Sequence, residues 1–224
     1  MKIINREWQR QIELEENVIH TLILENKVYY REIILELLRQ HKGLEGNFIL
    51  SEKNKEISFY KHSYFISDLF NMDINSKKVL SKVYTTLQKQ IEEDIVEYNQ
   101  LISFIKNYFE KLIFKNRLDL EQGEEIDILS LLKLGEFKIY FEENNYLEKI
   151  IKHVKILTDL CGVKVVFLIG LHSIFNEEEI KKFYKEICLN KINIVNIETQ
   201  QYNNNSSEEY KEVVYIFDKE DCEI

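Results

Sequence analysis

The stretch VKVVFLIGLHSIFNEEEIKKFYKEICLNKINIVNIE, residues 163–198, decides the fold class. It holds two short apolar runs, and an amphipathic segment lies between them. Parallel strands that are buried on both faces appear in a sequence as such unbroken apolar runs, and a crossover helix must join them. The stretch therefore predicts a strand–helix–strand unit within an α/β fold whose sheet is largely parallel.

The alternation continues on both sides of this stretch. Asn176 can cap the central helix, and Gly162 can end the preceding one in a left-handed conformation. The predicted elements are a helix over Asp127–Leu134, a strand over Glu136–Phe141, a helix over Asn145–Leu160, a strand over Val163–Ile169, a helix over Glu177–Leu189, and strands over Ile192–Ile197 and Val213–Phe217.

The first 75 residues mix the periods of strands and helices. Val18–Leu24 predicts a buried strand, and a helical apolar face follows it and ends near Gly43. Phe48–Leu50 and Ile57–Tyr60 flank a polar stretch, a pattern typical of a β-hairpin. This part of the chain is predicted to be rich in strands.

From residue 76 the period becomes helical. Apolar residues between Ile95 and Leu112 recur at alternating spacings of three and four, the pattern of a helix–helix seam. A single helix over Tyr84–Arg117 would be about 50 Å long. We expect a helical leg over residues 76–126, inserted between two parts of an α/β head over residues 1–75 and 127–224. The wide apolar stripe predicts burial against more than one partner, including another subunit.

Motifs for several enzyme classes are absent from the sequence. None of the six glycines forms GxxxxGK[ST] or GxGxxG, so a phosphate-binding loop is not supported. Ile192–Glu198 resembles a Walker B strand, but a solvated strand end is the favoured interpretation. The histidines show no zinc-binding spacing, and we expect Cys161, Cys188 and Cys222 to remain thiols. With no export signal and no apolar run long enough to cross a bilayer, we expect a cytoplasmic protein.

The net charge of −9 excludes attraction of nucleic acid by a generally basic surface. Any contact with DNA must come from a local cluster of basic side chains.

The most informative segment is LDLEQGEEIDIL, residues 118–129. Its acids and Gly123 form a flexible loop rich in the oxygen ligands that calcium prefers, although the spacing is not that of an EF-hand. On residue chemistry alone, the favoured interpretation is an exposed acidic loop whose last members stabilise the N-terminus of the helix that begins near Asp127. A metal-dependent nuclease is a further alternative.

The run LDLEQGEEIDILSLLKLGEFKI, residues 118–139, followed by the helix and strands up to Glu198, resembles the Csn2 family of subtype II-A CRISPR systems. The resemblance implies a P-loop-NTPase-like head without a Walker A motif and a helical leg. It also implies a ring of four subunits that binds double-stranded DNA ends, is stabilised by calcium, and has no catalytic chemistry of its own. Such a protein acts in spacer acquisition beside the CRISPR integrase subunits and the RNA-guided effector nuclease.

Within this resemblance, Asp119 and Glu121 match the first acids of the family's calcium loop, and Glu125 matches a later one. Asp127 is an additional candidate ligand. The loop is one residue longer than the family pattern, and Ser130 stands where some members carry an acid.

The candidate DNA-binding residues are lysines that an overall acidic ring would have to gather inside. Lys133 and the hairpin pair Lys53 and Lys55 rank first, followed by Lys27 and Lys61. Two other classes stay open: a divergent metal-dependent nuclease or NTPase that uses the loop acids, and a scaffold whose long helix recruits a protein partner.

Overall fold

The computed structural model describes residues 1–116, 119–123, 125–141, 145–202, 207–220 and 222. The chain divides into two compact units, one of residues 1–74 with 141–224 and one of residues 75–140. The second unit thus extends beyond residue 126, because α5 (Ile128–Leu134) contacts α3 (Lys77–Glu93).

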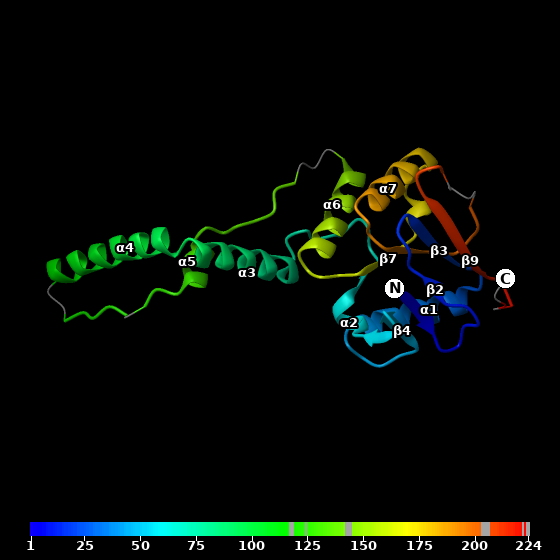
Figure 1. The fold of residues 1–224 in the computed structure, drawn as a ribbon, viewed down its shortest axis with the longest axis horizontal. Coiled ribbons are helices and arrows are strands. Elements are labelled where there is room, and N and C mark those ends of the chain that lie inside the picture. The colour runs from blue at the N-terminus through cyan, green and yellow to red at the C-terminus, as the bar shows by residue number, and fades with distance from the viewer. Residues whose placement is uncertain (117–118, 124, 142–144, 203–206, 221, 223–224) are drawn as a thin grey trace. The chain divides into compact units, whose positions relative to one another are not determined.

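Five parallel strands form the centre of the first unit, in the order β6-β7-β8-β3-β9 (Figure 1). The apolar runs of the three central strands, β7, β8 and β3, are buried on both faces, as crossover connections require, whereas β9 at the edge is mostly half-buried. The strands are β3 (Val18–Leu24), β6 (Ser63–Ile66), β7 (Val165–Ile169), β8 (Ile194–Glu198) and β9 (Lys211–Phe217). The predicted α/β class is confirmed, and β6 is a strand that the sequence pattern did not predict.

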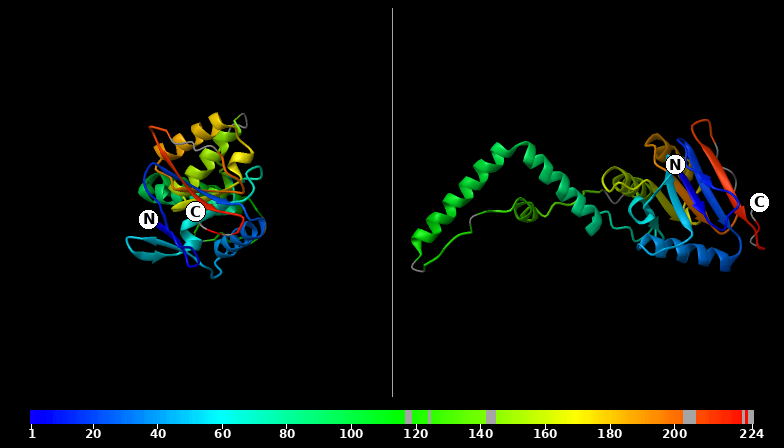
Figure 2. Two further views of the ribbon diagram at one scale, coloured as in Figure 1. Left: turned by 90° about the vertical axis from the view of Figure 1, so that its right-hand side faces the viewer. Right: turned by 60° about the horizontal axis from the view of Figure 1, so that its bottom comes forward.

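Helices and a second sheet cover the two faces of the parallel sheet (Figure 2). Leu22 and Val195 on one face pack with Ile33 of α1 (Lys27–His41) and with the antiparallel sheet. The other face lies under α6 (Tyr146–Asp159) and α7 (Glu177–Leu189) (Figure 1). Side-chain contacts between α7 and the strands, such as that of Tyr184 with Asn196, hold this layer in place.

The antiparallel sheet has the order β2-β1-β4-β5. Its strands are β1 (Lys2–Asn5), β2 (Ile12–Glu13), β4 (Phe48–Glu52) and β5 (Lys55–Ile57). The predicted hairpin is confirmed, but its second strand ends at Ile57. The short helix α2 (Phe59–His62) follows, because Ser58 caps it through the backbone N–H of Lys61.

The helical unit corrects the prediction of one long helix. α3 ends at Glu93 and α4 (Ile95–Lys115) begins directly after Asp94, whose backbone is not helical (φ −119°, ψ 54°). Acids are unfavourable at a helix C-terminus and favourable at an N-terminus. Breaking the helix at Asp94 therefore gives α4 a favourable first turn, with Asp94 and Glu97 at its start.

The strand predicted over Glu136–Phe141 is also wrong. Glu136 takes a positive φ of 44°, and no strand forms there. The side chain of Asn75 instead accepts a hydrogen bond from Ile139 N (2.8 Å) and donates one to Ile139 O (3.2 Å). A side-chain amide thus satisfies the backbone groups that a neighbouring strand would have paired.

The predicted helix ends in the first unit are confirmed. Asn176 and Glu179 form a reciprocal capping box at the start of α7, and Gly162 has a left-handed φ of 69° after α6. No helix in the described part of the chain is both long enough and apolar enough to span a membrane.

Candidate nucleic-acid interface and acidic loop

Two of the candidate lysines project from the β4–β5 hairpin. Lys53 and Asn54 form its two-residue turn with positive φ values of 50° and 59°, the conformation of a type I′ turn. Lys53 and Lys55 are exposed, and Lys55 lies opposite Glu52 in the register of the two strands. The turn and the strand residue that follows it therefore carry two exposed lysines.

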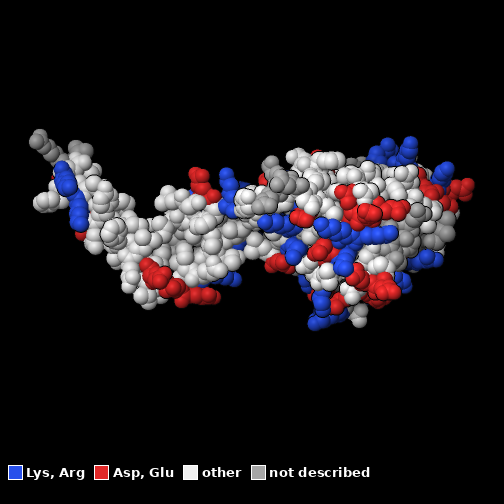
Figure 3. Space-filling model, turned by 90° about the horizontal axis from the view of Figure 1, so that it is seen from above, with Lys and Arg blue, Asp and Glu red and all other residues white. Residues whose placement is uncertain are grey.

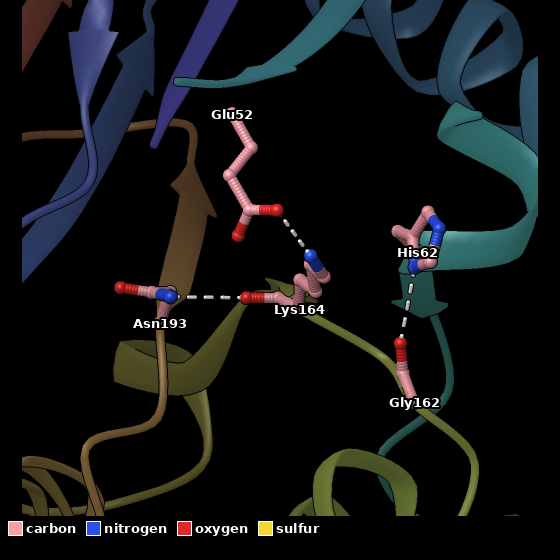
Figure 4. Close-up of polar contacts among 5 residues, drawn as sticks. All are labelled: Glu52, His62, Gly162, Lys164 and Asn193. Atoms are coloured by element: carbon pink, nitrogen blue, oxygen red, sulfur yellow. Dashed lines mark hydrogen bonds and ion pairs between the residues drawn. The ribbon is translucent and has the colours of Figure 1, made fainter. Parts of the chain in front are cut away.

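An ion pair fixes this hairpin to the parallel sheet (Figure 4). Lys164, just before β7, places its Nζ atom 2.6 Å from Oε2 of Glu52. This contact lowers the pKa of the Glu52 carboxyl. The backbone N–H of Lys164 donates to His62 O, and the amide of Asn193 donates to Lys164 O, so Lys164 is held from three sides.

These contacts place the hairpin at the amino edge of the parallel sheet, where β6, β7 and β8 begin. Lys61 lies at the same edge, because α2 leads directly into β6. Lys53, Lys55 and Lys61 all lie within residues 53–61, which we call the lysine segment. Among the described residues, none of its three lysines has a carboxylate within ion-pair distance.

The two remaining candidate lysines lie elsewhere. Lys27 opens α1 directly after the carboxyl end of β3, at the opposite edge of the sheet from Lys164. Lys133 lies in α5, in the second unit. The structure therefore gathers three of the five candidate lysines on one segment.

The connection from β3 to α1 is where a phosphate-binding loop would lie in a P-loop fold. Only Glu25 and Asn26 separate the strand from the helix. The side chain of Asn26 accepts hydrogen bonds from the backbone N–H groups of Val28 (2.8 Å) and Tyr29 (3.4 Å). The amides that could hold a phosphate are thus already used, in agreement with a head that lacks a Walker A motif.

The interpretation of Glu198 as a solvated strand end is wrong. Its side chain at the end of β8 is only 2% exposed and accepts a hydrogen bond from the backbone N–H of His172 (3.0 Å). Burial raises the pKa of this carboxyl to about 7. The turn after β7 covers the acid, because η1 (Leu171–Ser173) lies against β8.

The acidic loop connects α4 to α5 in the second unit, with Leu118 and Glu124 outside the described residues. Asp119, Glu121, Glu125 and Asp127 are all exposed. Tyr98 of α4 anchors the far end of the loop, because its hydroxyl donates to Ile126 O (2.8 Å). Burial raises the pKa of Tyr98, and the charges of Asp127 and Glu125 raise it further.

Asp127 already has a structural role. Its Oδ2 atom accepts hydrogen bonds from the backbone N–H (2.9 Å) and the hydroxyl (3.0 Å) of Ser130, and they lower the pKa of the carboxyl. Asp127 is therefore the N-cap of α5. Nowhere in the described chain do three acidic, histidine or cysteine side chains converge closely enough to hold a metal ion.

A model of the family described as CRISPR-associated protein (Cas_Csn2) matches residues 40–221. The chain belongs to the Csn2 family. The Csn2 match includes the lysine segment and the acidic loop, whereas Lys27 lies outside it.

Two curated Csn2 proteins are similar to this chain. The CRISPR-associated protein Csn2 of Enterococcus faecalis is 22% identical over 175 residues, which cover 76% of this chain and 78% of the relative. The CRISPR-associated protein Csn2 of Streptococcus agalactiae is 23% identical over 159 residues, which cover 69% and 68%.

The sequence reasoning missed the ion pair of Glu52 and Lys164. A signal was present, since Lys164 is a charged residue inside the longest strongly apolar run of the chain. A charge directly before a buried strand indicates an edge where a partner of opposite charge can lie. The identity of that partner follows only from the fold, because Glu52 is 112 residues away in sequence.

Replacing Asp127 with alanine is expected to lower the thermal midpoint of the protein in EDTA, because α5 loses its N-cap. Asp119→Ala is the matched control in the same loop, and it should leave the midpoint unchanged. Thermal unfolding followed by circular dichroism measures both variants. Equal midpoints for the two would show that the cap does not stabilise α5.

Proposed function

We propose that this Csn2 family member binds the ends of double-stranded DNA, without regard to sequence, in CRISPR spacer acquisition. The lysine segment carries this proposal. Its three lysines are exposed and have no described carboxylate within ion-pair distance, although the protein as a whole carries a net charge of −9. A local cluster of this kind is what contact with phosphates requires in an acidic protein.

The second unit supports assembly into a homotetramer. Among the described residues α4 has no buried side chain, although much of its sequence is apolar. Phe104 is 74% exposed and Phe114 is 92% exposed, and Figure 3 shows wide uncharged areas over the helical segment. Exposed apolar surface of this extent is typical of a protein interface. We infer that a second copy of the chain covers α4.

The acidic loop is the proposed calcium site. The donors Asp119, Glu121, Glu125 and Asp127 are carboxylates, which suit a hard cation. The buried Oε1 atom of Gln122, between these acids in sequence, has no hydrogen-bond partner in the described chain and adds a neutral oxygen donor. The donor chemistry therefore fits calcium. The ion would supply positive charge that draws the carboxylates together, and Tyr98 holds the end of the loop against α4.

We also propose that the protein has no catalytic activity and acts in the cytoplasm, beside the CRISPR integrase subunits and the RNA-guided effector nuclease. The cysteines fit a reducing compartment, because Cys161, Cys188 and Cys222 form no disulfide bond. Burial raises the pKa of Cys188 to about 11, so this thiol is inert as a nucleophile.

Gel retardation of linear and closed circular duplex, in calcium or in EDTA, tests the proposal. We expect retardation of linear DNA in calcium, its loss in EDTA and weak binding of circles. Light scattering should give four times the chain mass of 27.1 kDa. Equal binding of circles and linear duplexes, or a monomer in calcium, would contradict the proposal. Cleavage of the DNA in magnesium or manganese, lost in Asp119→Asn, would favour a nuclease instead.

A further inference from the structure

Aromatic rings form a row at the carboxyl edge of the parallel sheet, away from the lysine segment. Phe70 follows β6 and stacks on Tyr146 at the start of α6, with ring centroids 5.7 Å apart. Tyr146 in turn stacks on Phe175, which follows β7, at 6.1 Å. His172 and Tyr202, from the loops after β7 and β8, stack at 4.4 Å with their planes 21° apart. Five rings from three strand ends and one helix are thus gathered at one edge.

A pocket of about 680 Å³ opens at the end of this row. His172, Phe175 and Tyr202 line it together with Glu177 of α7. Its volume lies in the range of sites that take a small ligand or a partner's side chain. Phe70, which is 67% exposed, extends the apolar surface beyond the pocket.

The described lining of the pocket holds one charged side chain, the carboxylate of Glu177. Two buried acids lie behind the pocket: Glu198 accepts a hydrogen bond from His172 N, and Glu212 accepts one from the hydroxyl of Tyr184. Burial raises the pKa of Glu198 to about 7, so Glu198 adds little negative charge below neutral pH. Burial lowers the pKa of His172, so its ring is neutral at neutral pH. No lysine or arginine is among the described residues that line the pocket. Lys27 and Lys219 follow β3 and β9, and Lys149 and Lys181 lie within the first two turns of α6 and α7.

We propose that this pocket binds an arginine side chain from a protein partner. Aromatic rings attract a cation through their faces, and a carboxylate at the rim pairs with it. A guanidinium suits the site better than an ammonium, because it is planar, stacks on aromatic rings and loses less hydration energy. Nucleic acid would also stack on aromatic rings. Its phosphates, however, would meet the carboxylate of Glu177.

The neighbouring aromatic row gives the partner a place for apolar side chains beside the arginine. Interfaces concentrate their binding energy in aromatic and arginine residues surrounded by a polar rim. Phe70, Tyr146 and Phe175 provide such an aromatic surface, with Asp68 next to it. The occupant is thus a basic segment of a protein, docked by one arginine.

A peptide with one arginine, Gly-Gly-Arg-Gly-Gly-amide carrying a fluorescent dye on its N-terminus, tests the proposal by fluorescence anisotropy. A peptide with citrulline in place of arginine keeps the shape and removes the charge, and it should bind much more weakly. Glu177→Gln and Tyr202→Ala should each lower the affinity about fivefold, the effect of losing one partly exposed charge or ring contact. Glu178→Gln is the matched control, since Glu178 lies in the same first turn of α7 but does not line the pocket.

Equal binding of the citrulline and arginine peptides would overturn the proposal. So would tight binding of a single-stranded oligonucleotide that Tyr202→Ala abolishes, because the pocket would then be a base-stacking site. The variants should retain calcium-dependent retardation of linear duplex, so a failure here is distinct from a failure of the DNA-binding proposal. Thermal midpoints equal to that of Glu178→Gln exclude misfolding as the cause of lost binding.

Discussion

Replacing Lys53, Lys55 and Lys61 together with alanine is expected to weaken binding of linear duplex about 100-fold or more at about 0.1 M salt. Each lysine that contacts a phosphate releases about one counterion on binding. The slope of log affinity against log salt should therefore fall by about three for each subunit that touches the duplex. A filter-binding titration over a range of salt concentrations measures both quantities.

A second triple variant separates local contact from net charge. Lys27, Lys181 and Lys219 are exposed lysines that lie outside the lysine segment. Replacing them with alanine makes the same change in net charge, and it should alter the affinity only a fewfold. Equal losses in the two triple variants would contradict a DNA surface at the amino edge. They would also show that Lys27, a candidate from the sequence, contributes to binding after all.

Much of the fold could be predicted because the parallel strands carry their own signal. β3 and α7 have the predicted bounds, since a buried strand has no polar alternation and Asn176 marks the helix start. The errors arose where a single residue decides the structure. Asp94 breaks the helical pattern without glycine or proline, and Asn75 replaces a strand partner for Ile139 from 64 residues away. Neither effect is visible in local periodicity.

The candidate site was predictable in its residue types but not in its arrangement. The segment that holds Lys53 and Lys55 was recognised as a hairpin, because polar residues lie between two apolar runs. Lys61 lies at the same edge of the sheet as these two lysines because it precedes β6. Lys27 lies at the opposite edge because it follows β3. The direction of the strands and the long-range pair of Glu52 and Lys164 decide this, and both are properties of the tertiary fold.

Replacing Glu198 with glutamine is expected to stabilise the protein at about pH 8 by up to about 3 kcal/mol, and to change its stability little at about pH 5. The reason is the buried position of the carboxyl at the end of β8. Burial raises its pKa from 4.5 to about 7 in the folded protein, because the charged form loses its hydration. Glutamine has a similar shape, stays neutral, and can still accept the hydrogen bond from His172 N.

The direction in which stability changes with pH follows from the number of protons that the folded and unfolded states bind. Between about pH 4.5 and 7 the folded protein keeps the proton on Glu198 while the unfolded chain has released it, so stability falls as pH rises through this window. Above this window the buried charge of Glu198 destabilises the folded protein by its full amount, and below the window it does not destabilise it. His20 and His153 act in the opposite direction, because burial lowers their pKa to about 4 and the unfolded chain binds their protons first. The contribution of these two histidines to the stability of the protein therefore rises with pH.

The difference between the Glu198→Gln variant and the parent isolates the carboxyl, because both proteins share the two histidines. Urea unfolding at a series of pH values gives the free energy of unfolding of each protein. The difference should be near zero at low pH and grow through the window in which the parent loses its proton. Glu178→Gln, at an exposed position on α7, should give a difference that does not vary with pH. A flat difference for Glu198→Gln as well would mean that the acid is hydrated in solution and that the turn at His172 does not cover it.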